Sequence, residues 1–255
     1  MNLMVSIALV VTLIPALLLS LWNLTLSYSD WAVLWLLVLA GMIFRGNWSI
    51  VIAHWRAERG IVLRAESWLS RWFTGRVWAF LSSATLVLAL TPALAWQALT
   101  MSTVEAILLL TLAFASAWLF LSMRSFLARH VIPPFDRILA TGPSAWLLGL
   151  PFSVILFFIT WYTTTVPAEM FSASFSEIIQ SNFRHIPETR GWIAEILAVG
   201  YAIEAAKLWL IAQLRNYPIV TLILNLDAAL LGLLVARASV VIAHFVEAHY
   251  RGEVE

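Results

Sequence analysis

Long runs of apolar residues recur along this chain and decide what it can fold into. A helix needs about 20 mainly apolar residues to cross the roughly 30 Å of hydrocarbon in a bilayer. Seven such runs occur, with approximate bounds 3–22, 31–45, 77–96, 103–121, 145–166, 192–214 and 219–240. Because unpaired backbone groups are costly in lipid, each run should form a helix. The sequence therefore predicts an all-α, polytopic transmembrane bundle of about seven spans, with residues 1–255 forming one integral membrane domain.

The composition excludes several other classes of protein. Apolar residues make up 62% of the chain and charged residues 11%, whereas a soluble domain carries about 25% charged residues. There is no cysteine, which removes disulfides, thiolate metal sites and iron–sulfur clusters. The net charge is only +1, so we expect no nucleic-acid partner. None of the five histidines lies in the middle of a span, which disfavours a haem held between facing helices, and we expect no cofactor.

Two connections are too polar to span a membrane and too apolar to be free loops. The segment 48–76 alternates Trp and Ile with Arg, which is typical of a helix lying on a membrane surface. Its arginines suit anionic lipid headgroups, and the candidates are Arg56, Arg59, Arg64 and Arg71. In the segment 167–186, apolar side chains follow near-helical spacing at Phe171, Phe175, Ile178 and Phe183. We expect both segments to be interfacial helices, with membrane lipids as partners.

The distribution of Lys and Arg predicts the orientation, because cytoplasmic loops of membrane proteins carry an excess of both. The connections after the second, fourth and sixth runs hold ten basic residues, and the alternate connections with the C-terminal tail hold three. We therefore expect a multi-pass protein of the bacterial inner membrane. Its N-terminus should be cytoplasmic and, after seven crossings, its C-terminus should lie outside.

The last two runs carry the charged residues expected deepest in the membrane. Each such group costs about 2.5 kcal/mol or more to insert and normally points towards partners inside the protein. If these runs form an antiparallel hairpin around 215–218, Glu195 lies level with Arg237, and Asp227 lies level with the helical turn that carries Glu204 and Lys207. The predicted cluster consists of Glu195, Glu204, Lys207, Asn225, Asp227 and Arg237.

This charged hairpin has two interpretations. Paired charges make insertion tolerable and fix the register of two helices, which is a purely structural role. Alternatively, two carboxylates beside one ammonium leave one acid without a full partner, an arrangement typical of proton relays and ion sites.

Two weaker patterns lie at the edges of the spans. His244 and Glu247 share a helix face and are the only metal-ligand candidates, although we expect no metal site there. The segment 49–55, Ser-Ile-Val-Ile-Ala-His-Trp, resembles the segment 239–245, Ser-Val-Val-Ile-Ala-His-Phe. With seven spans the two segments end on opposite sides, as in an inverted repeat.

No catalytic or nucleotide-binding motif is present, whether Gly-x-Ser-x-Gly, a phosphate loop or His-Glu-x-x-His, so we do not expect an enzyme. The leading hypothesis is a small transporter or channel-like protein that moves an ion, with a proton among the candidates, or a small solute. The alternative is a non-catalytic membrane subunit of a larger secretion or energy-transducing complex, partnered by other subunits or by a second copy. A third is a membrane enzyme acting on lipid, with the Arg-rich segment holding headgroups.

Overall fold

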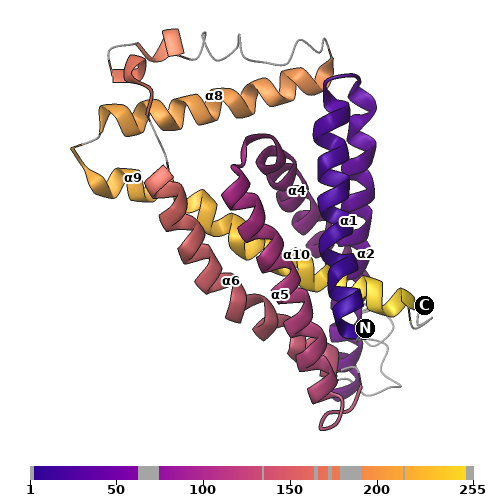
Figure 1. Cartoon of the computed structure of the whole chain (residues 1–255). Helices are drawn as coiled ribbons and strands as arrows, with labels where there is room; N and C mark the ends of the chain where they lie inside the picture. Colours follow the sequence, from indigo (N-terminus) through magenta and orange to yellow (C-terminus); the bar gives the residue numbers. More distant parts are fainter. Residues whose placement is uncertain are drawn as a thin grey trace.

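The computed structural model describes residues 3–62, 75–133, 135–163, 166–171, 174–178, 191–214 and 216–250, and these residues form helices and short connections only (Figure 1). The predicted helical membrane bundle is therefore confirmed. Among the described residues, six helices are long and apolar enough to cross a membrane. They are α1 (Leu3–Leu26), α2 (Val33–Val62), α4 (Arg76–Thr100), α5 (Thr103–Leu127), α6 (Phe135–Thr163) and α10 (Leu226–Tyr250), whose apolar stretch begins in α9 (Pro218–Leu224).

The sixth predicted span forms a helix, α8 (Trp192–Gln213), but this helix runs across one end of the bundle (Figure 1). Its start lies against η1 (Asp30–Ala32), since a Cβ at Gly191 would collide with the carboxylate of Asp30. Further along, the ring of Tyr201 packs on Trp96 at the end of α4, with ring centroids 4.9 Å apart. The antiparallel hairpin expected from 192–240 is therefore wrong, because α8 packs over helix ends and not along α10.

The start of α1 and the end of α10 lie at the same end of the bundle, here called the terminal end (Figure 1). Leu3 and Glu247 line one recess there. In consequence α2 and α10 run parallel: Gly46 lies against Val241 and, one turn further, Ser49 bonds to His244. The similar segments 49–55 and 239–245 therefore point in the same direction, and the inverted repeat predicted from them is wrong.

The helix bounds differ from the predicted spans at the terminal end. α2 continues to Val62 without a break, so residues 48–62 of the predicted interfacial segment form the end of the same helix as the second predicted span. These residues belong to a helix that packs on α4. At this contact the side-chain amide of Asn47 donates a hydrogen bond to Ser83 (3.1 Å), and Ile50 is buried. Residues 63–74 of that segment lie outside the described residues.

α6 begins ten residues earlier than predicted, because its first turn is held inside the protein by the buried carboxylate of Asp136. The second predicted interfacial segment, 167–186, contains η2 (Ala168–Phe171) and a helical turn at 175–178. Its other residues, except Pro167 and Ser174, lie outside the described residues.

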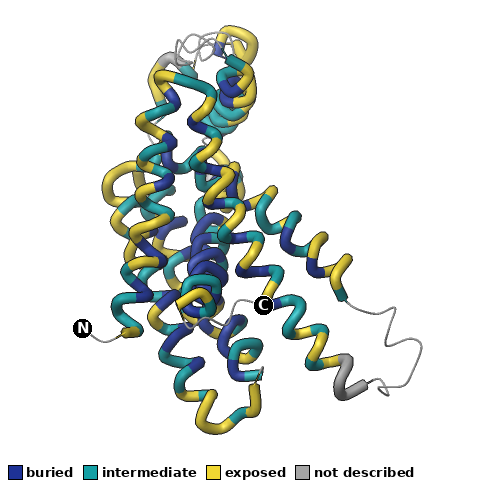
Figure 2. Tube along the Cα trace, turned by 90° about the vertical axis from the view of Figure 1, so that its right-hand side faces the viewer, coloured by how far each residue is buried: buried dark blue, intermediate teal, exposed yellow. Residues whose placement is uncertain are grey.

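α10 is the most buried of the six crossing helices and contacts α1, α2, α4, α5 and α6. Figure 2 shows the buried residues gathered in the middle of the bundle. Small side chains permit this close packing: Gly232 lies against Ser153 of α6, and Gly149 of α6 lies against Leu233 and Ala236. Helices in membranes associate through such small residues, because lipid supplies no hydrophobic drive between them.

Candidate functional site

Part of the predicted charge cluster forms where α8, α9 and α10 meet. The ammonium of Lys207 bonds to the Asp227 carboxylate at 2.7 Å, and this carboxylate also accepts the backbone N–H of Ala228 at 3.0 Å. Asp227 lies in the first turn of α10 with 62% of its side chain exposed. Asn225 is fully buried at the break between α9 and α10, and Glu204 is half-buried on α8. The Lys207–Asp227 pair therefore lies near the α8 end of the bundle.

The predicted pair of Glu195 and Arg237 is not formed. Glu195 is exposed in the first turn of α8, while Arg237 is half-buried in the middle of α10. The pairing was predicted from equal depth of the two residues in an antiparallel hairpin. α8 does not form that hairpin, because it runs across one end of the bundle (Figure 1).

A second charge cluster, the Arg124 cluster, lies at the terminal end and consists of Arg124, Asp136 and Glu247. The Arg124 side chain, from the last turn of α5, donates from Nε to Asp136 Oδ2 at 3.2 Å and from Nη1 to Glu247. All three residues are nearly inaccessible, at 6%, 4% and 3% exposure. One guanidinium thus joins α5, α6 and α10 by pairing with two buried carboxylates, which is the bidentate chemistry that arginine supplies best.

Sequence reasoning missed this cluster because Arg124 lay just beyond the predicted span and counted as a loop charge. The available signal was the acid Asp136 next to Arg137, close behind an apolar run, together with Glu247 in an apolar stretch that continues past residue 240. An acid in such a setting requires a partner, but only the fold shows which arginine supplies it.

His244 lies one turn before Glu247 and is 2% exposed. Its Nε2 shares a hydrogen bond with the exposed Ser49 Oγ at 2.6 Å, and its ring stands edge-on to Phe120. Its Nδ1 is buried without a hydrogen-bond partner among the described residues. The two weak metal-ligand candidates thus have protein partners, His244 with Ser49 and Glu247 with Arg124. The described residues contain no group of three or more His, Cys, Asp or Glu placed to hold a metal ion.

The Arg124 cluster lines a recess of about 380 Å³ at the terminal end, here called the terminal recess. Its walls come from the start of α1, the end of α5, the start of α6 and the end of α10, and Arg137 adds a second guanidinium. The second carboxylate oxygen of Asp136, Oδ1, is buried and accepts no hydrogen bond from a described residue. The recess thus offers an acceptor suited to a proton or to a donor group.

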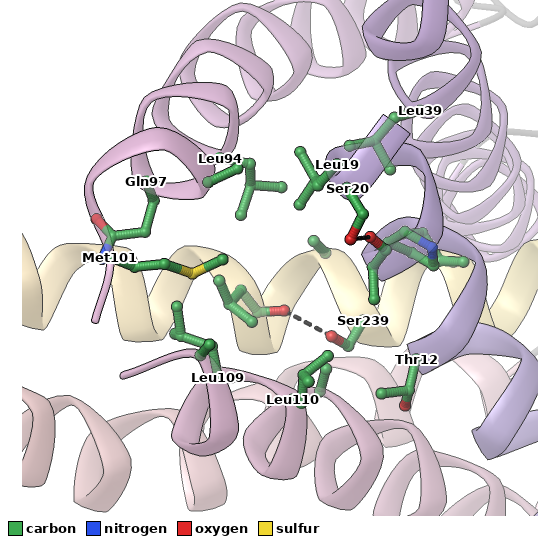
Figure 3. Close-up of a pocket in the computed structure, with 18 of the residues that line it drawn as sticks. Thr12, Leu19, Ser20, Leu39, Leu94, Gln97, Met101, Leu109, Leu110 and Ser239 are labelled. Atoms are coloured by element: carbon green, nitrogen blue, oxygen red, sulfur yellow. Dashed lines mark hydrogen bonds between the residues drawn. The ribbon is translucent and has the colours of Figure 1, made fainter. Parts of the chain in front are cut away.

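A second cavity, of about 260 Å³, is drawn in Figure 3 and is here called the upper cavity. It reaches the end of α4 that contacts α8 through Trp96 and Tyr201. α1, α4, α5 and α10 supply nearly all of its lining, and no charged side chain belongs to it. Its polar lining residues are Thr12, Ser20, Asn23, Gln97 and Ser239.

The two cavities share three helices and are separated by a sealed layer. Between them α1 contributes Ala8, α5 contributes Ala117 and Phe120, and α10 contributes Ala243; all four residues are 0% exposed. Phe120 contacts the ring of His244, which lies one turn before Glu247 on α10. The α1–α5–α10 interface therefore holds an apolar cavity, a packed layer and a charged recess in series.

The proposed headgroup ligands are only partly described. Arg56 is exposed near the end of α2, while the side chain of Arg59 and the whole of Arg64 and Arg71 lie outside the described residues. Comparison of this chain with protein families, curated proteins and solved structures finds no match.

Proposed function

We propose that this protein is a small membrane transporter or channel-like protein that moves a small solute or an ion along the α1–α5–α10 interface. The observation that carries the proposal is the series of upper cavity, sealed layer and terminal recess on the same three helices. Transporters place their sites between helices near the middle of the bundle and close one side at a time. A cavity on each side of one packed layer is the arrangement such a protein needs.

The Arg124 cluster is the proposed proton or ion site. Two carboxylates share one guanidinium, so adding a proton to either acid releases one ion pair while Arg124 keeps the other. Chains of Asp, Glu and His buried in a membrane typically mark proton pathways. Ser49 and His244 extend such a chain from an exposed hydroxyl to the neighbourhood of Glu247. A proton is thus the ion best suited to this site.

The earlier candidates then take different roles. The Lys207–Asp227 pair is proposed as a structural tie between α8 and α10, since the exposed Asp227 carboxylate needs no protein partner for solvation. Arg56, Arg59, Arg64 and Arg71 remain proposed ligands of anionic lipid headgroups.

The proposed location is the bacterial inner membrane with both termini in the cytoplasm. With six crossings the connections 45–76 and 124–137 and the C-terminal tail would share the membrane side of the terminal end, and their sequences hold ten of the fifteen basic residues. Four of the remaining five, Arg184, Arg190, Lys207 and Arg215, fall in the sequence between α6 and α9. The excess of basic residues supports a cytoplasmic terminal end.

One observation favours the alternative of a non-catalytic subunit. α8 exposes a continuous apolar stripe, formed by Trp192, Ile196, Val199, Ile203 and Leu210. The spacing of these residues places them on one helix face, and a helix that lies across a bundle end needs a cover for such a face. A partner subunit would provide that cover.

Proton flux in proteoliposomes tests the proposal. The purified chain is reconstituted with a pH-sensitive dye inside, and a pH gradient is imposed. We expect faster collapse of the gradient than in protein-free liposomes, loss of this flux in Asp136→Asn, and retention in the matched control Asp227→Asn. A wild-type protein with no flux that co-purifies with stoichiometric foreign chains, weighed by native mass spectrometry, would instead support the subunit.

A further inference from the structure

We infer that the upper cavity binds a small, uncharged and mainly apolar molecule with one hydrogen-bonding group, and that this is the substrate class of the proposed transporter. The chemistry of the lining carries the inference. Every lining residue is apolar, a hydroxyl or an amide, and none is charged. An ion would lose its hydration there with no opposite charge to compensate, and burying an unpaired charge is far more costly than burying a neutral polar group.

The hydroxyl groups of the cavity already donate hydrogen bonds to backbone carbonyls of their own helices. Thr12, Ser20 and Ser239 each donate a hydrogen bond to the carbonyl four residues earlier in their own helix, at 2.9, 2.8 and 2.8 Å. Figure 3 shows the bonds of Ser20 and Ser239. A ligand therefore meets three hydroxyl oxygens that can only accept. This arrangement favours few polar groups on the ligand.

Gln97 is the exception and sets the polar end of the site. Its side-chain amide lies at one edge of the cavity beside Met101 (Figure 3) and forms no hydrogen bond with any described residue. The amide of Asn23, at the same end, is held by the carbonyl of Ala98 at 3.2 Å. Gln97 can thus donate to and accept from a single polar group, while the apolar lining takes the remainder of the molecule.

The volume of the cavity and the exposure of the residues at its rim both fit a small, mainly apolar ligand. An apolar cavity of about 150 Å³ suffices to bind benzene, so a cavity of about 260 Å³ has room for one substituted ring. Ser20 and Asn23 on α1 are exposed, and Leu110 on α5 is 41% exposed. The cavity therefore opens between α1 and α5, on the lipid-facing side of two crossing helices, where apolar solutes are concentrated.

Photolabelling of the full chain in nanodiscs tests the inference. The probe is a neutral phenyl diazirine that carries one hydroxyl group, and its comparison is the analogue with a carboxylate in place of that hydroxyl. We expect the neutral probe to label peptides of α1, α5 or α10 that line the upper cavity, saturably, and the carboxylate to leave them unlabelled. Equal labelling by both probes, or labelling that follows lipid exposure alone, overturns the inference.

Matched variants distinguish labelling by probe bound in the cavity from labelling by probe dissolved in the bilayer. Ala113→Phe fills the cavity from α5 and should abolish its labelling, whereas Ile107→Phe adds the same ring to the exposed face of α5 and should leave it unchanged. If Ala113→Phe is not monodisperse, Ala16→Phe fills the same cavity from α1. Persistent labelling in a folded filling variant contradicts the site. The substrate role rests on the proposed function, but binding does not: cavity labelling without proton flux leaves the site standing and removes the proposed proton site at the Arg124 cluster.

Discussion

The ring of Phe120 stands edge-on to the imidazole of His244, with centroids 6.5 Å apart and ring planes at 89°. Both side chains are almost fully buried, and the contact joins α5 to α10 in the layer between the two cavities. An aromatic pair of this geometry contributes more than its buried area alone. The pair therefore helps to hold α5 against α10 in this layer.

Removal of the Phe120 ring should open the barrier. Phe120→Ala leaves a void in the sealed layer and should lower the free energy of unfolding by about 3–5 kcal/mol. It should also raise the proton leak of proteoliposomes above the wild-type rate, because the void connects the upper cavity to the terminal recess. Phe126→Ala, which removes a 62% exposed ring from the same helix, is the control and should change neither quantity. A leak unchanged in folded Phe120→Ala would show that the barrier lies elsewhere.

The parallel packing of α2 on α10 should depend on one glycine. A Cβ at Gly46 would collide with the backbone carbonyl of Val241, whereas Gly41, on the same helix, has nothing within 4 Å. Gly46→Ala should therefore lower the thermal unfolding midpoint. Gly41→Ala should leave the midpoint unchanged or raise it, since alanine favours a helix over glycine by about 1 kcal/mol. Equal midpoints for the two variants would argue against the close approach of these helices.

The Arg124 cluster should be essential for stability as a set of three. Arg124→Ala leaves two buried carboxylates without their cation, and such a loss costs about 3–5 kcal/mol. Arg45→Ala, which removes an exposed arginine from α2, should have little effect on the same thermal unfolding curve.

A combined variant tests whether that loss comes from uncompensated charge. Replacing Arg124, Asp136 and Glu247 together by leucine should cost less than Arg124→Ala alone, because buried ion pairs can be replaced by apolar packing. If the triple variant is the less stable of the two, the cluster stabilises the fold by more than charge compensation.

The crossing helices follow from composition and run length, and six of the seven predicted spans became the cores of α1, α2, α4, α5, α6 and the α9–α10 stretch. The course of α8 does not follow from composition and run length. A 22-residue helix that carries both an apolar stripe and charges is equally suited to cross a membrane and to lie on its surface. Because α8 does not form a hairpin with α10, the pair of Glu195 and Arg237 predicted from equal depth does not form. The Arg124 cluster depends on contacts between residues over 100 positions apart, which helical periodicity along one segment cannot encode.

The number of crossings can be read from labelling of single cysteines, since the chain has none of its own. Leu3→Cys places an exposed thiol at the start of α1 and Tyr250→Cys places one at the end of α10, both at the terminal end. Ser27→Cys places one in the turn between α1 and α2. With six crossings and a cytoplasmic terminal end, a membrane-impermeant maleimide should label only residue 27 in intact cells. After permeabilisation it should label all three. Labelling of residue 250 but not residue 3 in intact cells would require an odd number of crossings, and α8 would then have to be a span.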